Sequence, residues 1–547
     1  MQSSRRTFLI ASASAVGALL GSRAEPALAR GRAGASSGAV VSSGSLDAET
    51  RRALRGIAHD TWKFFGDDVD PTTHLPYDNV TYAGGSATPT SVGRYTSAAN
   101  IGVFLWSVVA ARDLGLITDS EAVLRARNLL STVKKLQRYK GFLYQWYDTT
   151  TGSVLLNPGQ GDVAQPGGTF DNGSFLSCVD NGWYVTGLVI TRQAIPQLRG
   201  LVNQLMLDVD FSIFYDNRAE TVCNVNPAIP GNQPTGQMYG GYYVGNPPDE
   251  GTNWQHYYHS GALYSDPRIS AYLGMGLRQM PGNVWWRSWR MLPPPAPFPS
   301  CTTDPDFSWQ GQWPLPNDWI TVHDPVSGGT FPVFESHYTY PGTDLRFIPT
   351  WGGGMFEALM ANVVVPETSW GPNSFGLADV RTVEVQRKYA TEVLQFPVWG
   401  MSPSSTPDDS GGYSTYGVEG LRFPYYGGGA TAQNPNLGLS QCHGCATEDV
   451  VAPHASFLAL DPAPQDAVAN IDTLMSRFPQ VYGSRGFFDA LNPTTGAVGH
   501  RLLVLDQSMI MGSLANALND RSMQRYFAND PVSWAARAVL SYEHMTI

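Results

Sequence analysis

Two aspartates stand where predicted helices begin, and together they could hydrolyse a glycosidic bond. Asp180 occurs in V-D-N-G-W (179–183), beside a predicted turn pair and an aromatic typical of exposed positions, and Asp266 occurs in Y-S-D-P-R-I (264–269). Such hydrolysis needs two carboxyl groups flanking the bond, one donating a proton and one activating water or attacking directly. Asp is also a preferred helix cap and Pro is common at the first helical position, so either residue could instead be only a cap.

Other residues could contact a sugar at the same place. The predicted substrate-binding group comprises Trp183, Arg268, Trp351, Glu357, Tyr413, Tyr416, Glu448, Asp449, His454, Asp489 and Asp506. Its aromatic rings could stack on sugar faces or pack in the core. Glu357 could bind sugar hydroxyls or pair with Arg346 or Arg422, and His454 could contact a sugar or serve in the core.

The composition narrows the range of partners. The chain has 547 residues, a formal net charge of −11, 15 Trp and 25 Tyr. An acidic balance argues against nucleic acid or an anionic membrane surface. The sequence has no P-loop, serine-hydrolase elbow, zinc-protease or dinucleotide-binding motif, so we expect neither a cofactor nor a metal ion. Five cysteines include C-H-G-C (442–445), for which a local disulfide, free thiols and a metal site are all open.

The N-terminus carries a predicted export signal. S-R-R-T-F-L (4–9) is a twin-arginine pattern, and A-L-A (27–29) follows as a predicted cleavage site. The apolar run between them is shorter than the ~20 residues that span a bilayer. We therefore expect 1–29 to be removed, 30–46 to be a flexible linker, and 47–547 to form one domain outside the cytoplasm.

Helical periodicity dominates the rest of the chain. Predicted helices begin near Asp47, Ser97, Thr118, Asp180, Pro196 and Asp266, and others cover 355–365, 380–394, 449–460, 464–478, 502–518 and 531–542. About twelve helices, mostly paired, predict an all-α toroid of two concentric rings, with two separate domains as the alternative. In a toroid, alternate helices start at the same end. Acids at those starts would converge on one cleft, where the positive helix ends favour carboxylates.

Seven motifs strengthen this interpretation through a family resemblance. They are T-S-A-A-N-I-G-V-F-L-W-S-V-V-A-A-R-D-L-G (96–115), V-D-N-G-W (179–183), Y-S-D-P-R-I (264–269), W-G-G-G-M-F-E-A-L-M (351–360), E-D-V-V-A-P-H-A-S (448–456), G-F-F-D-A-L-N (486–492) and L-V-L-D-Q-S-M (503–509). In this order they resemble the glucoamylase-like glycoside hydrolases. That group includes bacterial endo-β-1,2-glucanases and the related domain of cyclic β-1,2-glucan synthases.

The resemblance implies an (α/α)6 toroid and inverting hydrolysis of a β-glucan, most often β-1,2-linked. It implies that Asp180 and Asp266 are the acid/base pair, and our first hypothesis is that Asp266 donates the proton and Asp180 is the base or positions water. Relatives commonly carry Glu at the position of Asp266, and the shorter side chain could signal a different substrate. A glycosidase acting on another cell-envelope polymer or exopolysaccharide, and a carbohydrate-binding protein without catalysis, are the alternatives. The expected partner is a polysaccharide or oligosaccharide, and the oligomeric state is left open.

Overall fold

The structure is a computed structural model that describes residues 46–155, 175–217, 236–244, 260, 262–288, 290, 319–334, 337–340, 343–418 and 450–547. The predicted export signal, residues 30–45 of the predicted linker and the side chain of Trp351 lie outside this description. So do the following predicted residues: Glu448, Asp449, Cys223, Cys301, Cys442 and Cys445.

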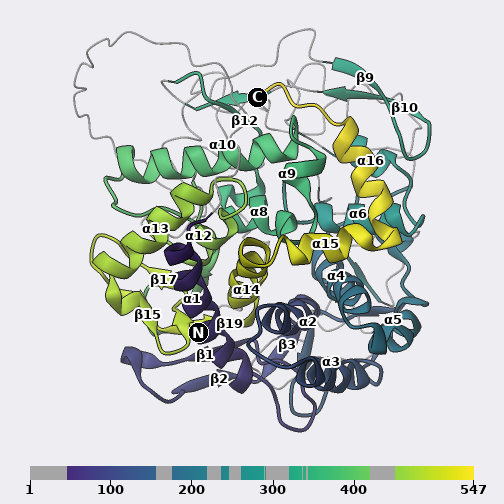
Figure 1. Cartoon of the computed structure of the whole chain (residues 1–547). Helices are drawn as coiled ribbons and strands as arrows, with labels where there is room; N and C mark the ends of the chain where they lie inside the picture. The colour runs from purple at the N-terminus through teal and green to yellow at the C-terminus, as the bar shows by residue number, and fades with distance from the viewer. Residues whose placement is uncertain are drawn as a thin grey trace, which may run out of the picture.

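The described chain is mostly helical, with short strands between the helices (Figure 1). We call six helices of the described chain inner because they are buried along most of their length: α2 (Ala98–Asp113), α4 (Cys178–Ala194), α6 (Arg268–Gly276), α8 (Met355–Val364), α12 (His454–Leu458) and α14 (Val504–Leu518). The outer helices are α1 (Ala48–Asp67), α3 (Asp119–Val133), α5 (Arg199–Met206), α10 (Phe375–Lys388), α13 (Pro464–Arg477) and α16 (Trp534–Tyr542). Among the inner helices, α14 packs against α2, and α2 in turn packs against α4. No helix in these parts of the chain is both long and apolar enough to cross a membrane.

Most predicted helices are confirmed, and side-chain caps explain two of their starts. The hydroxyl of Ser97 accepts a hydrogen bond from the Asn100 backbone at the start of α2, and Thr118 does the same for Glu121 in α3. The α3 helix ends at Val133, and residues 138–143 form a tight hairpin after it. Three short helices are not apparent from periodicity: α7 (Asn283–Trp286), α9 (Glu367–Trp370) and α15 (Ser522–Asn529).

The closest approach between inner helices, that of α2 and α4, depends on two glycines. A Cβ atom on Gly187 would lie 2.2 Å from the backbone oxygen of Gly102, and one on Gly102 would lie 2.2 Å from that of Trp183. No side chain fits in that space. Gly102 is the fifth of the 16 residues of α2, and it meets the middle of α4, so the two helices pack side by side.

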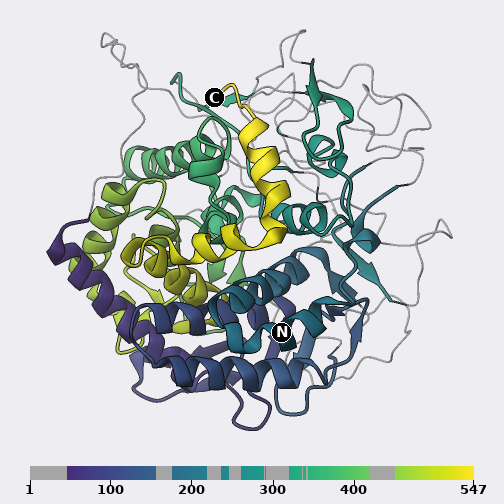
Figure 2. The ribbon, with the colours of Figure 1, turned by 45° about the vertical axis from the view of Figure 1, so that its right-hand side comes forward.

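The α15 helix covers the opposite end of the inner helices. It contacts α2, α4, α8 and α14, and Figure 2 shows it crossing in front of them. The amide of Gln524 donates to the Asn362 carbonyl near the end of α8, and Asn516 near the end of α14 donates to the Val363 carbonyl. The carbonyl ends of α8 and α14 are therefore bridged by side chains, whereas the other end is built from strands and loops.

The strands are short and pair antiparallel. The one three-stranded sheet of the described residues joins β1 (Asn79–Thr81) and β2 (Ser91–Gly93) to β19 (Arg501–Leu503), with Val80 opposite Leu502. The two-stranded pairs are β3 (Tyr95–Ser97) with β6 (Trp146–Asp148), β4 (Arg138–Tyr139) with β5 (Phe142–Leu143), β7 (Phe175–Ser177) with β8 (Gly241–Tyr243), β9 (Trp319–His323) with β10 (Thr330–Phe334), β11 (Tyr338–Thr339) with β12 (Arg346–Phe347), β13 (Ser404–Ser405) with β14 (Tyr413–Ser414), β15 (Tyr482–Gly483) with β16 (Gly486–Phe487), and β17 (Ala490–Leu491) with β18 (Val498–Gly499).

Four of the turns share one pattern that helical periodicity does not predict. They are D-P-T-T-H (70–74), D-T-T-T-G (148–152), D-P-V-S-G (324–328) and N-P-T-T-G (492–496). In each, the first side chain accepts hydrogen bonds from the backbone two and three residues later, and the fifth residue has positive φ. An Asp or Asn followed four residues later by a residue that tolerates this φ is a turn signal, and here it marks hairpins between helices.

Replacing Gly187 with Ala should force α2 and α4 apart, because its new Cβ would meet backbone rather than a movable side chain. Overpacking of this kind costs about 1–3 kcal/mol of unfolding free energy. Gly56 is the matched control, since it is exposed in the middle of α1 and a Cβ there meets nothing within 4 Å. Gly56→Ala should stabilise by about 0.5–1 kcal/mol. Thermal and denaturant unfolding measure both variants. If Gly187→Ala and Gly56→Ala changed stability equally, the close approach of α2 and α4 would be contradicted.

Candidate active site

The inner helices begin at a common end. The hydroxyl of Ser270, in the first turn of α6, donates to the carbonyl of Cys178 at the start of α4, at 2.8 Å. From the same turn, the guanidinium of Arg268 donates to the carbonyl of Ala358 in α8, at 2.6 Å. Because each contact joins one helix start to the next, the positive ends of these helices lie near one another.

Asp180 lies in the first turn of α4 and is not the helix cap. The cap is Ser177, whose hydroxyl accepts a hydrogen bond from the backbone N–H of Asp180. The carboxyl side chain is nearly enclosed, with 2% of its residue surface exposed. The predicted turn at Asn181 and Gly182 is wrong: both are helical, and Asn181 instead bonds both backbone groups of Leu143 through its amide.

Asp266 precedes α6 by two residues and is half-buried. The residue before the helix is Pro267, so Asp266 lies one residue further from the helix than the cap position. Its carbonyl accepts the backbone N–H of Ile269. Gly182 of α4 lies against Ile269 and Ser270, which places the Asp266 turn beside the first turn of α4. The two predicted catalytic residues therefore come from adjacent helix starts.

A further buried acid at this end, Asp78, was not predicted. One carboxylate oxygen of Asp78 accepts from the Asn100 amide at 2.8 Å, and the other accepts from Asn79 at 3.0 Å. Its carbonyl accepts the backbone N–H of Val504, so the residue joins the starts of α2 and α14. The signal in the sequence is the short Y-D-N run (77–79) shortly before the helix at Ser97.

Three predicted sugar-binding residues meet at the starts of α12 and α14. Nδ1 of His454 lies 4.0 Å from an oxygen of Asp506, and the ligand-type atoms of His454, Asp489 and Asp506 all lie within 4.8 Å of one another. All three side chains are buried. Burial lowers the pKa of His454 to about 4, against an opposing effect of Asp489, so the imidazole is neutral at pH 7. These groups could hold a metal ion, which the sequence did not predict.

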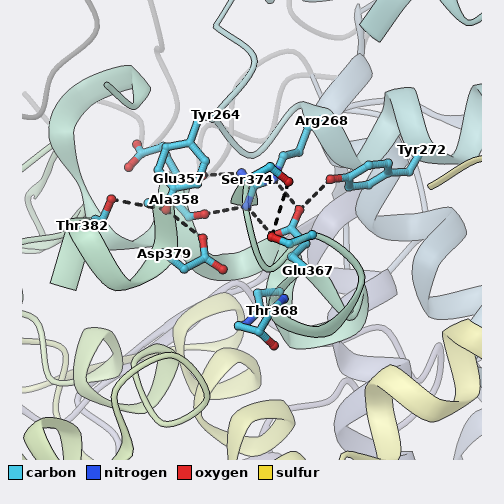
Figure 3. A network of polar contacts seen from close by, with 12 residues as sticks. Tyr264, Arg268, Tyr272, Glu357, Ala358, Glu367, Thr368, Ser374, Asp379 and Thr382 are labelled. Carbon is cyan, nitrogen blue, oxygen red and sulfur yellow. Dashed lines mark hydrogen bonds and ion pairs between the residues drawn. The ribbon is translucent and has the colours of Figure 1, made fainter. Parts of the chain in front are cut away.

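A buried ionic network holds α6, α8 and α9 together, as Figure 3 shows. The guanidinium of Arg268 makes a two-point ion pair with Glu367, at 2.7 and 2.8 Å, and also donates to the carbonyl of Glu357. Tyr272 donates to the same Glu367 carboxylate. Burial opposes the charge on Arg268, but the attraction of Glu367 outweighs it and raises the pKa of the guanidinium. The network thus fixes the start of α6 against the start of α8.

Asp379 of α10 is the second acid of this network. It accepts the hydroxyl of Tyr264 at 2.8 Å, and its other oxygen has no hydrogen-bond partner among the described residues. Burial, and then repulsion from Glu367, raise the pKa of Asp379 well above its usual range. Of the two acids, Asp379 is therefore the one at which a proton is favoured, while Glu367 forms the ion pair with Arg268.

Two predicted substrate-binding residues face the protein interior instead. Trp183 is 1% exposed and packs edge-on against Trp106, so neither ring face is open to a sugar. Arg268 has a fully buried side chain whose nitrogens bond to protein groups, contrary to the expectation that it binds substrate. Both outcomes arise because these two side chains lie on faces of α4 and α6 that pack against neighbouring helices, where Trp183 meets Trp106 and Arg268 meets Glu367.

The other predicted contacts differ in exposure. Glu357 in the first turn of α8 is buried, and so is Tyr416, whereas Tyr413 in β14 is half-buried. Of the cysteines, Cys178 is described and is a free thiol. Burial raises the pKa of Cys178 to about 12, so this thiol stays protonated and is a poor nucleophile.

Substituting Asp379 with Asn should change how stability depends on pH. Because the folded pKa of Asp379 is raised above its usual value of 3.8, the wild type must keep a proton to fold, and stability is lost as pH rises above that value. Asn does not titrate, so Asp379→Asn should gain stability relative to wild type as pH rises above about 4, by at most about 1.4 kcal/mol per pH unit. Urea unfolding at several pH values measures this. Asp472→Asn, at an exposed acid, is the control. The prediction would be contradicted if the free energy of unfolding changed with pH in the same way for wild type and both variants.

Two parts of the chain match known protein families. Residues 305–531 match a family described as "Putative glucoamylase", and residues 56–223 match a family described as "Protein of unknown function (DUF3131)". Over 103 residues the chain is 36% identical to the cyclic beta-(1,2)-glucan synthase NdvB of Rhizobium meliloti. That match covers 18% of this chain and 4% of the relative.

Solved structures share the fold at low sequence identity. An endo-beta-1,2-glucanase from Chitinophaga pinensis, solved with sophorotriose and glucose, superimposes with a TM-score of 0.59 at 15% identity and covers 90% of this chain and 98% of its own. A "putative glucoamylase" from Bacteroides caccae gives 0.58 at 16% identity, covering 90% and 98%. The protein is therefore glucoamylase-like in fold, and residues 305–531 match that family directly.

Proposed function

We propose that the protein is a secreted glycoside hydrolase that cleaves a β-glucan, with β-1,2-glucan as the first candidate. The observation that carries this proposal is the placement of Asp180 and Asp266 at adjacent helix starts, where two carboxyl groups could flank one bond. Similarity in fold to an endo-beta-1,2-glucanase, and the short match to a cyclic beta-(1,2)-glucan synthase, support the substrate class.

The proposed architecture is an (α/α)6 toroid. The contact of α14 with α2 supports a closed inner ring, as does the joining of α4, α6 and α8 at their starts. The outer helices α1, α3, α5, α10, α13 and α16 each pack against an inner helix. A closed ring would bring residues that are hundreds of positions apart in the sequence to the same end, where they could form one site.

In the proposed mechanism, Asp266 donates a proton to the leaving oxygen and Asp180 activates water. Asp180 lies in the first turn of α4, where the positive helix end favours the ionised carboxylate that a base requires. Asp266 lies ahead of its helix and is the more exposed of the two. Inversion requires room for water between the carboxyl groups, with a separation of roughly 6.5–9.5 Å.

Several predicted residues are proposed to shape the sugar subsites. Tyr413 is only half-buried and is a candidate for stacking on a sugar face. Some predicted residues are buried and would support the groups that contact the sugar: Glu357, Tyr416, Asp489 and Asp506. Three others remain proposals from the sequence: Trp351, Glu448 and Asp449. The twin-arginine pattern at residues 4–9 supports export.

Changing either catalytic residue to its amide should remove turnover but keep the fold. Asp180→Asn and Asp266→Asn should each lower kcat on linear β-1,2-glucan at least about 100-fold, because each loses a proton-transfer group. Asp472→Asn, at an exposed acid of α13, should behave like wild type. Reducing-end assays measure the rate, and NMR of the newly formed anomer reports inversion or retention.

A panel of polysaccharides separates the proposed function from its alternatives. Turnover of another glucan but not of β-1,2-glucan would keep the chemistry and replace the substrate. Binding of β-1,2-glucan without release of reducing ends would favour a non-catalytic protein. Wild-type rates in both amide variants would exclude Asp180 and Asp266 from the mechanism.

A further inference from the structure

We propose that His454, Asp489 and Asp506 form a binding site for one first-row divalent cation, such as Zn²⁺ or Mn²⁺. One nitrogen and two carboxylate oxygens are ligands that both ions accept. The three ligand-type atoms lie within 4.8 Å of one another. This site does not depend on the proposed hydrolase activity, since it follows from the cluster itself.

The three residues reach the cluster from separate segments. His454 is the first residue of α12, Asp506 is in the first turn of α14, and Asp489 lies just before β17. The 4.0 Å between Nδ1 of His454 and Oδ1 of Asp506 is too long for a hydrogen bond. Two ligand atoms at about 2.1 Å from one ion lie roughly 3–4 Å apart, so a small movement would bring both into a coordination shell.

Two atoms of these residues that could serve as ligands make no hydrogen bond among the described residues. Nδ1 of His454 and Oδ1 of Asp489 are buried and make no hydrogen bond within the described part of the chain. Buried polar atoms are nearly always satisfied, so two unsatisfied atoms on residues of one cluster need an explanation. A cation between them supplies the missing partner for both.

Neighbouring groups hold the ligands in orientation by their other atoms. Nε2 of His454 lies 2.9 Å from the hydroxyl of Ser402, which leaves Nδ1 turned toward the carboxylates. The backbone N–H of Ser405 donates to Oδ2 of Asp489 at 2.6 Å, which leaves Oδ1 for a cation. Metal-binding histidines and carboxylates are commonly oriented through their second atom in this way. The single segment 402–405 therefore positions two of the three ligands.

Charge favours a cation over a neutral ligand here. Asp489 and Asp506 place two carboxylates beside one imidazole, and Asp489 has no ion pair with Lys or Arg in the described ranges. A divalent ion would balance both carboxylates. Three protein ligands leave a further coordination position for water or a sugar hydroxyl, which would connect this site to the proposed substrate site.

The test is direct measurement of metal binding by the full-length protein. After EDTA treatment and desalting, titration calorimetry with Zn²⁺ and with Mn²⁺ should show about one equivalent bound by wild type for at least one of them. The melting temperature should rise with that ion and fall back when EDTA is added. Less than about a tenth of an equivalent of either ion, with no shift in melting temperature, would overturn the proposal.

Variants assign the binding to these residues. Asp506→Asn and Asp489→Asn should each weaken binding at least tenfold and abolish the metal-dependent shift in melting temperature. The control is Asp409→Asn, which changes an exposed Asp beside His500 and should leave binding unchanged. His454→Gln serves as a second variant if an aspartate variant does not fold, as judged by circular dichroism. Wild-type affinity in any folded variant of the three would overturn the assignment.

Discussion

The side-by-side start of the inner helices is the constraint on which the site depends. Each α-helix carries a partial positive charge at its N-terminus, and here several such ends lie close together. The glycines Gly102 and Gly187 permit the approach of α2 and α4, and Gly182 permits that of α4 and α6. Helix dipoles and amide donors offset part of the cost of burying acids at this end. Asp78, for example, accepts hydrogen bonds from the side-chain amides of Asn100 and Asn79.

The same end has to stay rigid although it is rich in charge. The ion pair of Arg268 with Glu367 achieves this by also binding carbonyls in the first turn of α8. A buried pair of this kind contributes little net stability, because the free-energy cost of removing both charges from water offsets most of their mutual attraction. Its effect is geometric, because it fixes the turn that carries Asp266 relative to Glu357. A proton on Asp379 beside it avoids a second uncompensated charge.

The two ends of the inner helices have different tasks. At the far end, α15 and the amides of Asn516 and Gln524 satisfy helix carbonyls and close the structure. At the near end, hairpins and turns lead into the helices and bring in acids such as Asp489 from outside them. Stability and chemistry are thereby separated along the helix axes. Variation in the near-end loops could change substrate or metal preference without disturbing the core.

The sequence by itself determined the helices and most of the chemical groups. Periodicity and the caps at Ser97 and Thr118 are local signals, and they placed the helices to within a few residues. Tertiary structure alone decided which groups can reach a ligand. Trp183 looked exposed but packs on Trp106, and Arg268 meets a partner 99 residues away in Glu367. A local pattern gives a residue's type and its helix, but the helices packed around it determine what its side chain meets.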